Sequence, residues 1–307
     1  MGKDILSILD VKDSLGALIA DSARLKSEVG KKSTKKSPPL AHKNIALLFE
    51  KPSLRTKASF AVAVDQLGGR STYMGPDEVQ IGKRESPADA GKVLSRYFDA
   101  IVYRAFSHST IVELAEAASV PVINALDDQE HPCQIIADLV TINEKKGGLH
   151  GRKLAYIGDG NNVCNSLLLG CAAIGMDMMV ASPSNFKPKQ EFVSKAEELA
   201  KASGSKVEVV TNPFKAAENA DVVYTDVWVS MGQEGDREAK EKLFLPYQVT
   251  PKLMSKAKDD AVFMHCLPAH RGLEVLPEVI DGEKSIVFDQ AENRLHAQKA
   301  ILLASLL

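Results

Sequence analysis

The feature that most limits the fold of this chain is the alternation of short apolar runs with amphipathic segments. The runs are apolar throughout, which is typical of strands buried on both faces of a parallel sheet. The expected strands are residues 44–49, 71–74, 100–104, 120–125, 153–158, 178–182, 206–210, 221–225, 261–265 and 285–288. The expected helices between them include residues 86–98, 109–118, 134–146 and 189–202. This alternation predicts an α/β fold with right-handed crossovers.

The length of 307 residues suffices for two such domains. A charged, glycine-rich stop ends a helical pattern at residues 145–148, and a new strand is expected from Lys153. We therefore expect two doubly wound parallel-sheet domains joined by helices, residues 1–141 and 142–290, with the active site in the interdomain cleft. The helical segment 291–307 is expected to pack back on the first domain.

Composition excludes several classes of function. The net charge of −2 gives no global basic field, so the basic stretch 31–39 is expected to be a solvated loop and nucleic acid is not an expected partner. Four cysteines without a C-x-x-C pattern favour reduced thiols in the cytoplasm. No apolar run approaches the roughly 18–20 residues of a membrane span, and the N-terminus lacks a secretory pattern. We expect a cytoplasmic protein without a membrane partner.

Hydroxyl and basic side chains follow the first expected strand. Ser53, Arg55, Thr56 and Lys57 lie where that strand ends and a helical pattern begins. Open α/β sheets bind ligands at this edge, and the free N–H groups of a helix N-terminus favour a phosphate or another dianion. Cations in the first turn oppose the helix dipole, so an anionic partner accounts for them. The alternative is an ordinary N-cap serine with solvated cations.

Polar residues also follow three later strands. His131 and Gln134 offer an imidazole and an amide to a small planar ligand, although a helix cap is equally consistent. Asp226 begins a loop that suits an amino group and a closing flap, unless it is only a capping aspartate. His265 and Cys266 are neighbours on an extended strand, so the histidine is not expected to activate the thiol directly. A buried structural cysteine is the alternative there.

Residues 158–163 begin like a dinucleotide-binding fingerprint but do not complete it. Val163 stands where the third glycine is expected, and Ser182 ends the next strand where an acid would bind ribose. NAD is therefore disfavoured, and the asparagines at 161 and 162 suit a carboxylate instead.

A zinc site is conceivable from two pairs of neighbouring side chains. These are His131 with Cys133, and His265 with Cys266. Their spacings do not match the usual patterns of zinc ligands. The sequence therefore predicts no metal and no cofactor.

Taken together, these segments resemble the aspartate/ornithine carbamoyltransferase family. Residues 53–57 are similar to its carbamoyl-phosphate motif S-x-R-T-R, and residues 131–134 to its H-P-x-Q. Residues 226–232 and 265–268 are similar to the substrate loop and the H-C-L-P of the members that use ornithine. Residues 158–162 and 289–299 also match, so the resemblance covers nearly the whole chain in the expected order.

The resemblance implies transfer of a carbamoyl group from carbamoyl phosphate to the δ-amine of L-ornithine, giving L-citrulline and phosphate. The amine attacks directly, and the site stabilises the developing oxyanion. The first domain would bind carbamoyl phosphate and the second ornithine. The family assembles as homotrimers, sometimes of higher order. Arginine biosynthesis is the expected context, although the sequence does not separate synthesis from breakdown.

The resemblance also assigns roles to individual residues. Those expected to bind carbamoyl phosphate are Ser53, Leu54, Arg55, Thr56, Gln80, Arg104, His131, Gln134, Cys266, Leu267 and Arg294. Those expected to bind ornithine are Asn162, Asp226, Ser230 and Met231. The expected catalytic residues are Arg104, His131, Cys266 and Arg294. Gln80 matches a loop that reaches a neighbouring subunit's site in the family. Lys57 departs from the usual arginine and lacks its bidentate fork.

Three alternatives remain open at this point. Other members of the family use aspartate, putrescine or N-acetylornithine, and the loop at 230–232 favours ornithine. A dinucleotide-dependent dehydrogenase could be built on residues 153–163. A non-catalytic binding module could share the same fold.

Overall fold

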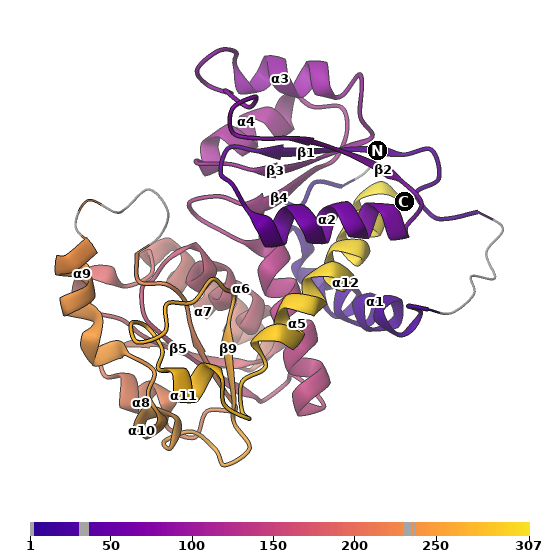
Figure 1. Cartoon of the computed structure of the whole chain (residues 1–307). Coiled ribbons are helices and arrows are strands. Elements are labelled where there is room, and N and C mark those ends of the chain that lie inside the picture. The colour runs from indigo at the N-terminus through magenta and orange to yellow at the C-terminus, as the bar shows by residue number, and fades with distance from the viewer. Residues whose placement is uncertain (1–2, 31–36, 230–234, 236) are drawn as a thin grey trace. The chain divides into compact units, whose positions relative to one another are not determined.

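A computed structural model describes residues 3–30, 37–229, 235 and 237–307 of the chain. The chain divides into two compact units, Met1–Val140 with Glu292–Leu307, and Thr141–Ala291 (Figure 1). We call them unit 1 and unit 2. Two helices contribute to both units, α5 (Pro132–Lys146) and α12 (Val287–Leu306).

Unit 1 contains a parallel sheet in the order β2-β1-β3-β4. Its strands are β1 (Asn44–Phe49), β2 (Arg70–Met74), β3 (Ala100–Arg104) and β4 (Val122–Leu126). Its helices are η1 (Ile8–Ser14), α1 (Leu15–Ser27), α2 (Leu54–Gln66), α3 (Pro87–Leu94) and α4 (His108–Ala117). Figure 1 shows α3 and α4 on one side of this sheet and α2 on the other. All five residues of β3 are buried, as a central strand covered on both faces requires.

Unit 2 contains a parallel sheet in the order β7-β6-β5-β8-β9. Its strands are β5 (Lys153–Ile157), β6 (Asp177–Ala181), β7 (Val207–Val210), β8 (Val222–Thr225) and β9 (Val262–His265). Its helices are α6 (Asn162–Ile174), η2 (Ser184–Phe186), α7 (Gln190–Ser203), α8 (Pro213–Ala217), α9 (Arg237–Phe244), η4 (Leu245–Tyr247), α10 (Pro251–Met254) and α11 (Pro277–Ile280). Trp228, Phe244 and Phe263 belong to the buried cluster between this sheet and helices α8 to α11.

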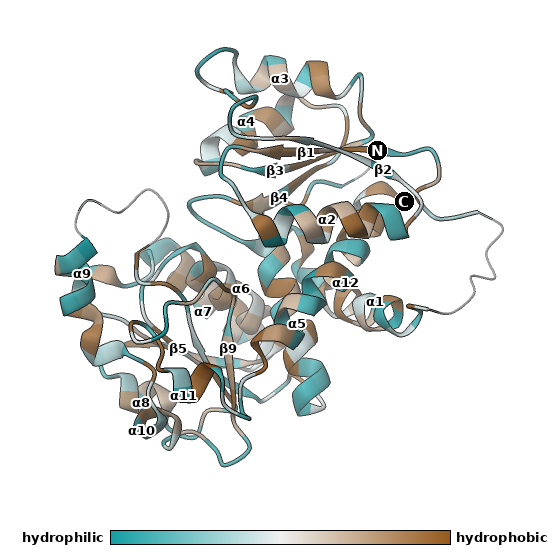
Figure 2. Cartoon of the chain, viewed as in Figure 1, coloured by the Kyte–Doolittle hydropathy of each residue, from teal (hydrophilic) through white to brown (hydrophobic). Residues whose placement is uncertain are grey.

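The two parallel sheets confirm the predicted α/β fold class. In Figure 2 strands β1, β3 and β4 are mostly brown, in keeping with the apolar runs from which they were predicted, whereas the more polar β2 is pale. Strand β4 begins at Val122, two residues late, because Pro121 has no N–H to give to a ladder. The expected helix 86–98 ends at Leu94.

The strand expected at residues 285–288 is wrong. Ser285 makes a single bridge to Phe263, and Val287 already begins α12. Ile286, directly before that helix, and Val287, its first residue, are both buried. Four apolar residues do not distinguish a buried strand from the start of a buried helix.

Segments near the two ends of the chain contact each other within unit 1. The N–H group of Lys3 donates to the carbonyl of Ser305 at 3.1 Å. The ammonium group of Lys26 on α1 lies 2.8 Å from the side-chain oxygen of Asn293 on α12.

Within the described ranges, no helix combines the length and the apolar character needed to cross a membrane. Most of the basic stretch at 31–39 falls on residues 31–36, which lie outside the described residues.

Candidate active-site residues

In unit 1, the N-terminus of α2 carries the expected phosphate motif. Ser53 is the N-cap of this helix, and its hydroxyl accepts the N–H of Thr56 at 3.4 Å. The Thr56 side chain is buried, and its hydroxyl accepts a hydrogen bond of 2.7 Å from Nη2 of Arg294 on α12. Arg294 is only 3% exposed. A buried guanidinium therefore lies at the free N–H groups of a helix N-terminus, an arrangement that favours an anion.

Two further buried cations, Lys51 and Arg104, lie at the ends of strands β1 and β3. Arg104 ends β3 with 5% exposure, and its carbonyl accepts the N–H of Glu50 at 3.0 Å, which ties the two strand ends together. Burial lowers the pKa of Lys51, and the nearby charge of Arg104 lowers it further, while Asp128 and Asp127 oppose the shift. Two like charges this close are stabilised by an anion between or beside them.

His131 lies directly before α5 and is 4% exposed. Burial, together with the charges of Arg294 and Arg104, holds the pKa of His131 well below its usual range. The imidazole is therefore neutral at physiological pH and can donate one hydrogen bond without carrying charge. Gln134, one turn into α5 and 1% exposed, donates from its amide nitrogen to Asp138 at 2.8 Å.

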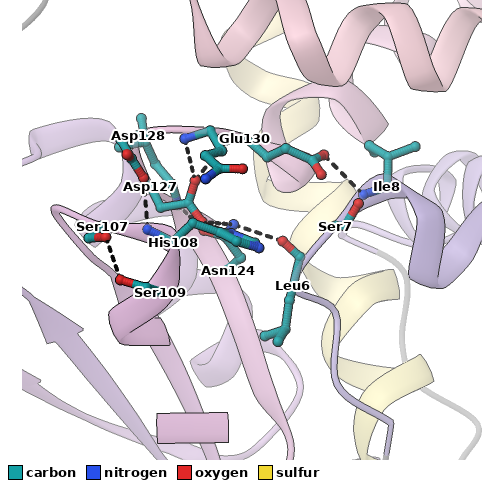
Figure 3. A network of polar contacts seen from close by, with 12 residues as sticks. Leu6, Ser7, Ile8, Ser107, His108, Ser109, Asn124, Asp127, Asp128 and Glu130 are labelled. Carbon is teal, nitrogen blue, oxygen red and sulfur yellow. Dashed lines mark hydrogen bonds and ion pairs between the residues drawn. The ribbon is translucent and has the colours of Figure 1, made fainter. Parts of the chain in front are cut away.

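A network of polar contacts holds the loop that leads to His131 (Figure 3). Asp127 lies at its centre and is fully buried. Its carboxylate accepts from the backbone N–H of Glu130 at 2.7 Å, from the side-chain amide of Asn124 at 2.8 Å and faces Nδ1 of His108 at 2.6 Å. Glu130 in turn accepts the N–H of Ile8 at 3.2 Å. The sequence reasoning missed this network, because its members come from three segments that are far apart in the sequence.

Three expected residues of unit 1 lie apart from these buried groups. Leu54 is 81% exposed at the start of α2, where only its backbone N–H can serve a ligand. Lys57 points its ammonium group at the ring of Tyr73, 3.6 Å from the centroid. Gln80 is exposed, and its carbonyl accepts the N–H groups of the two residues at 83 and 84. The side chain of Gln80 therefore faces solvent in the isolated chain.

In unit 2, Asp226 joins the ends of three strands. It follows β8, is 6% exposed, and accepts from Nδ2 of Asn161 at 2.7 Å and from the thiol of Cys266 at 3.0 Å. Asn161 is also the N-cap of α6, where its oxygen accepts the N–H groups of Val163 and Cys164. Asn162 occupies the first position of α6 and is half-buried. Parallel strands β5, β8 and β9 thus bring a carboxylate, an amide and a thiol to one edge of the sheet.

An ion pair that the sequence did not reveal lies beside this group. The ammonium group of Lys240 on α9 is 2.6 Å from Asp159, and both side chains are nearly buried, 10% and 12% exposed. Burial raises the pKa of Asp159, although Lys240 acts in the opposite direction. The next residue, Gly160, has room for no side chain, because a Cβ there would lie 2.1 Å from the nitrogen of Pro188.

Two of the expected ornithine-binding residues, Ser230 and Met231, lie outside the described residues. Leu267 is half-buried directly after Cys266, with a φ of +58° that is unusual for a residue with a branched side chain.

A metal is poorly suited to the residues of unit 2 that could hold one. Ligand atoms of Asp226, His265 and Cys266 lie within 4.8 Å of one another. However, Nδ1 of His265 accepts the N–H of Leu267 at 2.8 Å, and Nε2 faces Glu274 at 3.3 Å. Each ring nitrogen already has a protein partner, so the imidazole has no lone pair directed at an ion.

The sequence analysis expected that His265 does not activate Cys266, because neighbouring residues of one strand point to opposite faces. That argument does not apply, since β9 ends at His265 and Cys266 lies outside the strand. Both ring nitrogens point to other groups, and the thiol donates to Asp226. In unit 1, burial raises the pKa of Cys133 to about 12, and its thiol donates to the carbonyl of Asn124. A protonated thiol of this kind is a poor zinc ligand.

Comparisons with known proteins match both halves of the chain to one family. Residues 3–144 match the carbamoyl-P binding domain of aspartate/ornithine carbamoyltransferases, and residues 150–305 match their Asp/Orn binding domain. The catabolic ornithine carbamoyltransferase of Thermoplasma volcanium is 54% identical over 300 residues, which cover 98% of this chain and 97% of that protein.

Two further relatives extend this likeness. The ornithine carbamoyltransferase of Archaeoglobus fulgidus is 51% identical, over 98% of this chain and 96% of its own. The structure of ornithine carbamoyltransferase from Pyrococcus furiosus is similar with a TM-score of 0.94 and 46% identity, over 98% of this chain and 96% of that chain. The chain belongs to the aspartate/ornithine carbamoyltransferase family.

Proposed function

We propose that the chain transfers the carbamoyl group of carbamoyl phosphate to the δ-amine of L-ornithine, giving L-citrulline and phosphate. The observation that carries this proposal is the separation of charge between the two units. In unit 1, buried Arg294 contacts the N-terminus of α2, and buried Lys51 and Arg104 lie at the ends of two strands. In unit 2, the buried carboxylate of Asp226 lies at the strand ends with an amide and a thiol as donors. Relatives about half identical to this chain are named ornithine carbamoyltransferases.

Carbamoyl phosphate is assigned to unit 1. Its phosphate would accept from the backbone N–H groups and hydroxyls at the start of α2 and from the nearby arginines. The residues proposed to hold it are Ser53, Leu54, Arg55, Thr56, Arg104 and Arg294, with Gln80 contributed from a neighbouring subunit. The helix N-terminus and the buried contact between Arg294 and Thr56 support this assignment.

The carbamoyl group would meet donors that suit its oxygen. Arg104, the neutral imidazole of His131 and the hydroxyl of Thr56 are proposed to stabilise the negative charge that develops on that oxygen. Gln134 offers an amide to the planar carbamoyl group. A neutral histidine fits this role, because it donates a hydrogen bond without competing for the phosphate as a counter-charge.

Ornithine is assigned to unit 2. Asp226 would pair with the α-ammonium group, and Asn162 at the start of α6 would bind the α-carboxylate. Ser230 and Met231 are proposed to contact the substrate as well. Cys266, whose thiol lies 3.0 Å from Asp226, would adjoin the reacting δ-amine. Leu267 follows it and would contact the carbamoyl group.

The chemistry needs no protein nucleophile. The neutral δ-amine attacks the carbamoyl carbon, a C–N bond forms, and the C–O bond to phosphate breaks. The departing phosphate can take the proton that the nitrogen releases. Holding two substrates in contact and stabilising one oxyanion provide most of the expected rate. Because only the neutral amine attacks, the rate should rise with pH while the protein remains folded.

The proposal also covers the oligomeric state, the cellular location and the metabolic direction. We propose a homotrimer or a higher assembly of trimers in the cytoplasm, as the family resemblance and the reduced cysteines imply. Gln80, which is exposed in the isolated chain, would be free to reach a neighbouring subunit. Relatives named catabolic and one named anabolic both align with 98% of this chain. The names of the relatives therefore do not favour arginine biosynthesis over arginine breakdown for this chain.

A citrulline assay tests the proposal directly. Carbamoyl phosphate is offered with L-ornithine, aspartate, putrescine or N-acetylornithine, and each carbamoylated product is quantified by mass spectrometry. We expect citrulline to be the dominant product, formed with an equal amount of phosphate. Preference for another amine would reject the proposed substrate, and binding without any product would favour a non-catalytic module.

A further inference from the structure

His265 links strand β9 to the turn that follows it. The side chain is completely buried, and the backbone N–H donates to Oε1 of Gln290 at 3.0 Å. Nδ1 accepts the N–H of Leu267 at 2.8 Å. Because Nδ1 is an acceptor, the ring proton must be on Nε2, which faces Oε1 of Glu274 at 3.3 Å. The ring therefore has a defined tautomer, with one partner on each side.

Glu274 is buried beneath this turn, with 1% exposure. Its Oε1 also accepts the backbone N–H of His270 at 2.5 Å. Its own carbonyl accepts the N–H of Val249 at 2.9 Å, so its backbone is held independently of the side chain. A buried carboxylate is costly unless it is well bonded. Here its partners are the ring of His265, the backbone N–H of His270 and, 3.7 Å from Oε2, Nδ1 of the His270 ring.

The turn needs such a support. Leu267 has a φ of +58°, a conformation that residues with side chains adopt only when the surroundings enforce it. The preceding residue, Cys266, donates its thiol to Asp226 at 3.0 Å. The contacts therefore run from Glu274 through His265 to Leu267, and the position of Leu267 fixes the cysteine beside the aspartate.

We propose that Glu274 is a positioning residue that acts through His265 to hold Cys266 and Leu267 in place for carbamoyl transfer to ornithine. This inference rests on the proposed function for its effect on catalysis. Its structural part, the fixed position of Cys266, can be measured without any substrate. The two parts can therefore fail separately.

The first measurement is alkylation of Cys266 by iodoacetamide, resolved by peptide mass spectrometry. Cys133, Cys164 and Cys171 are buried, whereas Cys266 is half-buried. Glu274→Met fills a similar volume but has no oxygen acceptor, so we expect Cys266 to react about tenfold faster. Glu274→Gln keeps an oxygen for the ring N–H and should stay within about threefold of the unchanged protein.

The second measurement is steady-state kinetics on the same variants. Glu274→Met should lower kcat/KM for ornithine about tenfold, and Glu274→Gln should restore most of it. The dissociation constant of inorganic phosphate should be unchanged in both. Glu278→Met is the matched control, because it makes the same change at an exposed glutamate of the nearby helix α11, and it should behave as the unchanged protein.

Several results would overturn the proposal. One is a Cys266 alkylation rate within twofold of normal in Glu274→Met. Another is equal acceleration at all four thiols, which would indicate general loss of structure. Nitrogen-15 NMR of the His265 ring in the unchanged protein needs no variant, and a proton found on Nδ1 would contradict the proposed chain of contacts. If the variants change Cys266 alkylation as expected but the unchanged protein forms no citrulline, the positioning of Cys266 by Glu274 stands and only the proposed function is rejected.

Discussion

Units 1 and 2 place opposite charges at the same point of the same kind of sheet. In unit 1, the ends of β1 and β3 carry the cations Lys51 and Arg104, and Arg294 reaches the start of α2. In unit 2, the ends of β5 and β8 carry the carboxylates Asp159 and Asp226. A parallel sheet determines where a ligand binds, and the side chains after each strand determine its charge.

The two units also differ in which charges neighbour these ionisable side chains. The charge of Arg104 lowers the pKa of Lys51, and the charge of Asp226 contributes to raising that of Asp159. In unit 2, Lys240 already compensates Asp159, which leaves Asp226 with neutral donors from Asn161 and Cys266. Unit 1 is therefore suited to a dianion and unit 2 to a single ammonium group, and the following variants test each half of this contrast.

The largest effect is expected for Arg55→Ala in unit 1. Charge-assisted bonds to a phosphate contribute about 1.5–3 kcal/mol each, so the affinity for carbamoyl phosphate should fall at least about 100-fold. Lys57→Ala is the matched control, since this cation of the same helix turn points at Tyr73. Its effect should be several-fold smaller. Near-normal turnover in Arg55→Ala would refute the proposed role of that residue.

The next effect is expected for Asp226→Asn in unit 2. Loss of the charge that pairs with the α-ammonium group should raise KM for ornithine about 30-fold, or about 2 kcal/mol. KM for carbamoyl phosphate should change less than about threefold, because the groups proposed to hold its phosphate are in unit 1. Initial-rate kinetics with each substrate varied in turn measures both. The reverse pattern would reject the assignment of substrates to units.

A smaller effect on stability is expected for Lys240→Met. This variant leaves the carboxylate of Asp159 buried without its cation. Because the two side chains are 10% and 12% exposed, the free energy of unfolding should fall by about 1–2 kcal/mol, less than for a completely buried ion pair. Urea denaturation measures it. The double variant with Asp159→Asn removes both charges and should recover most of the loss. If the double variant were less stable than Lys240→Met, the unpaired charge of Asp159 would not be the cause of the loss.

The smallest effect is a pH dependence at His108 in unit 1. The hydrogen bond to Asp127 raises the pKa of His108, with burial acting against it. A histidine whose pKa is raised on folding stabilises the protein fully below its unfolded value of about 6.5, and this contribution disappears as the pH rises through the folded value. The Tm difference between the unchanged protein and His108→Gln should therefore shrink from pH 6 to pH 9. A difference that grows with pH would contradict the pairing.

Local patterns in the sequence were enough to predict most of the fold. Ser53 and Asn161 cap their helices as short-range hydrogen bonding requires. Most of the confirmed strands are runs of mainly apolar residues, whereas β2 and β7 also contain exposed polar residues. The failure at residues 285–288 has the same origin, because a short apolar run has no periodicity to distinguish a strand from a helix start.

The site depends on contacts that no local pattern contains. Arg294 and Thr56 are 238 residues apart, and Lys240 and Asp159 are 81 apart. Arg294 and Thr56 were each expected in the site only through the family resemblance, but their contact was not predicted, and the second pair was missed altogether. Glu274 was also missed, because a glutamate in a loop gives no sign of burial until the fold places His265 above it. Burial and tertiary pairing, which decide these roles, are properties of the folded chain.

Hydrogen exchange with each ligand added alone tests the central claim most directly. Phosphonoacetamide, a stable mimic of carbamoyl phosphate, should slow exchange of the backbone amides at 54–57 in unit 1. Ornithine, added afterwards, should slow exchange around residues 162 and 226 in unit 2. Protection of unit 2 by phosphonoacetamide, with residues 54–57 exchanging as before, would contradict the division of charge between the two units.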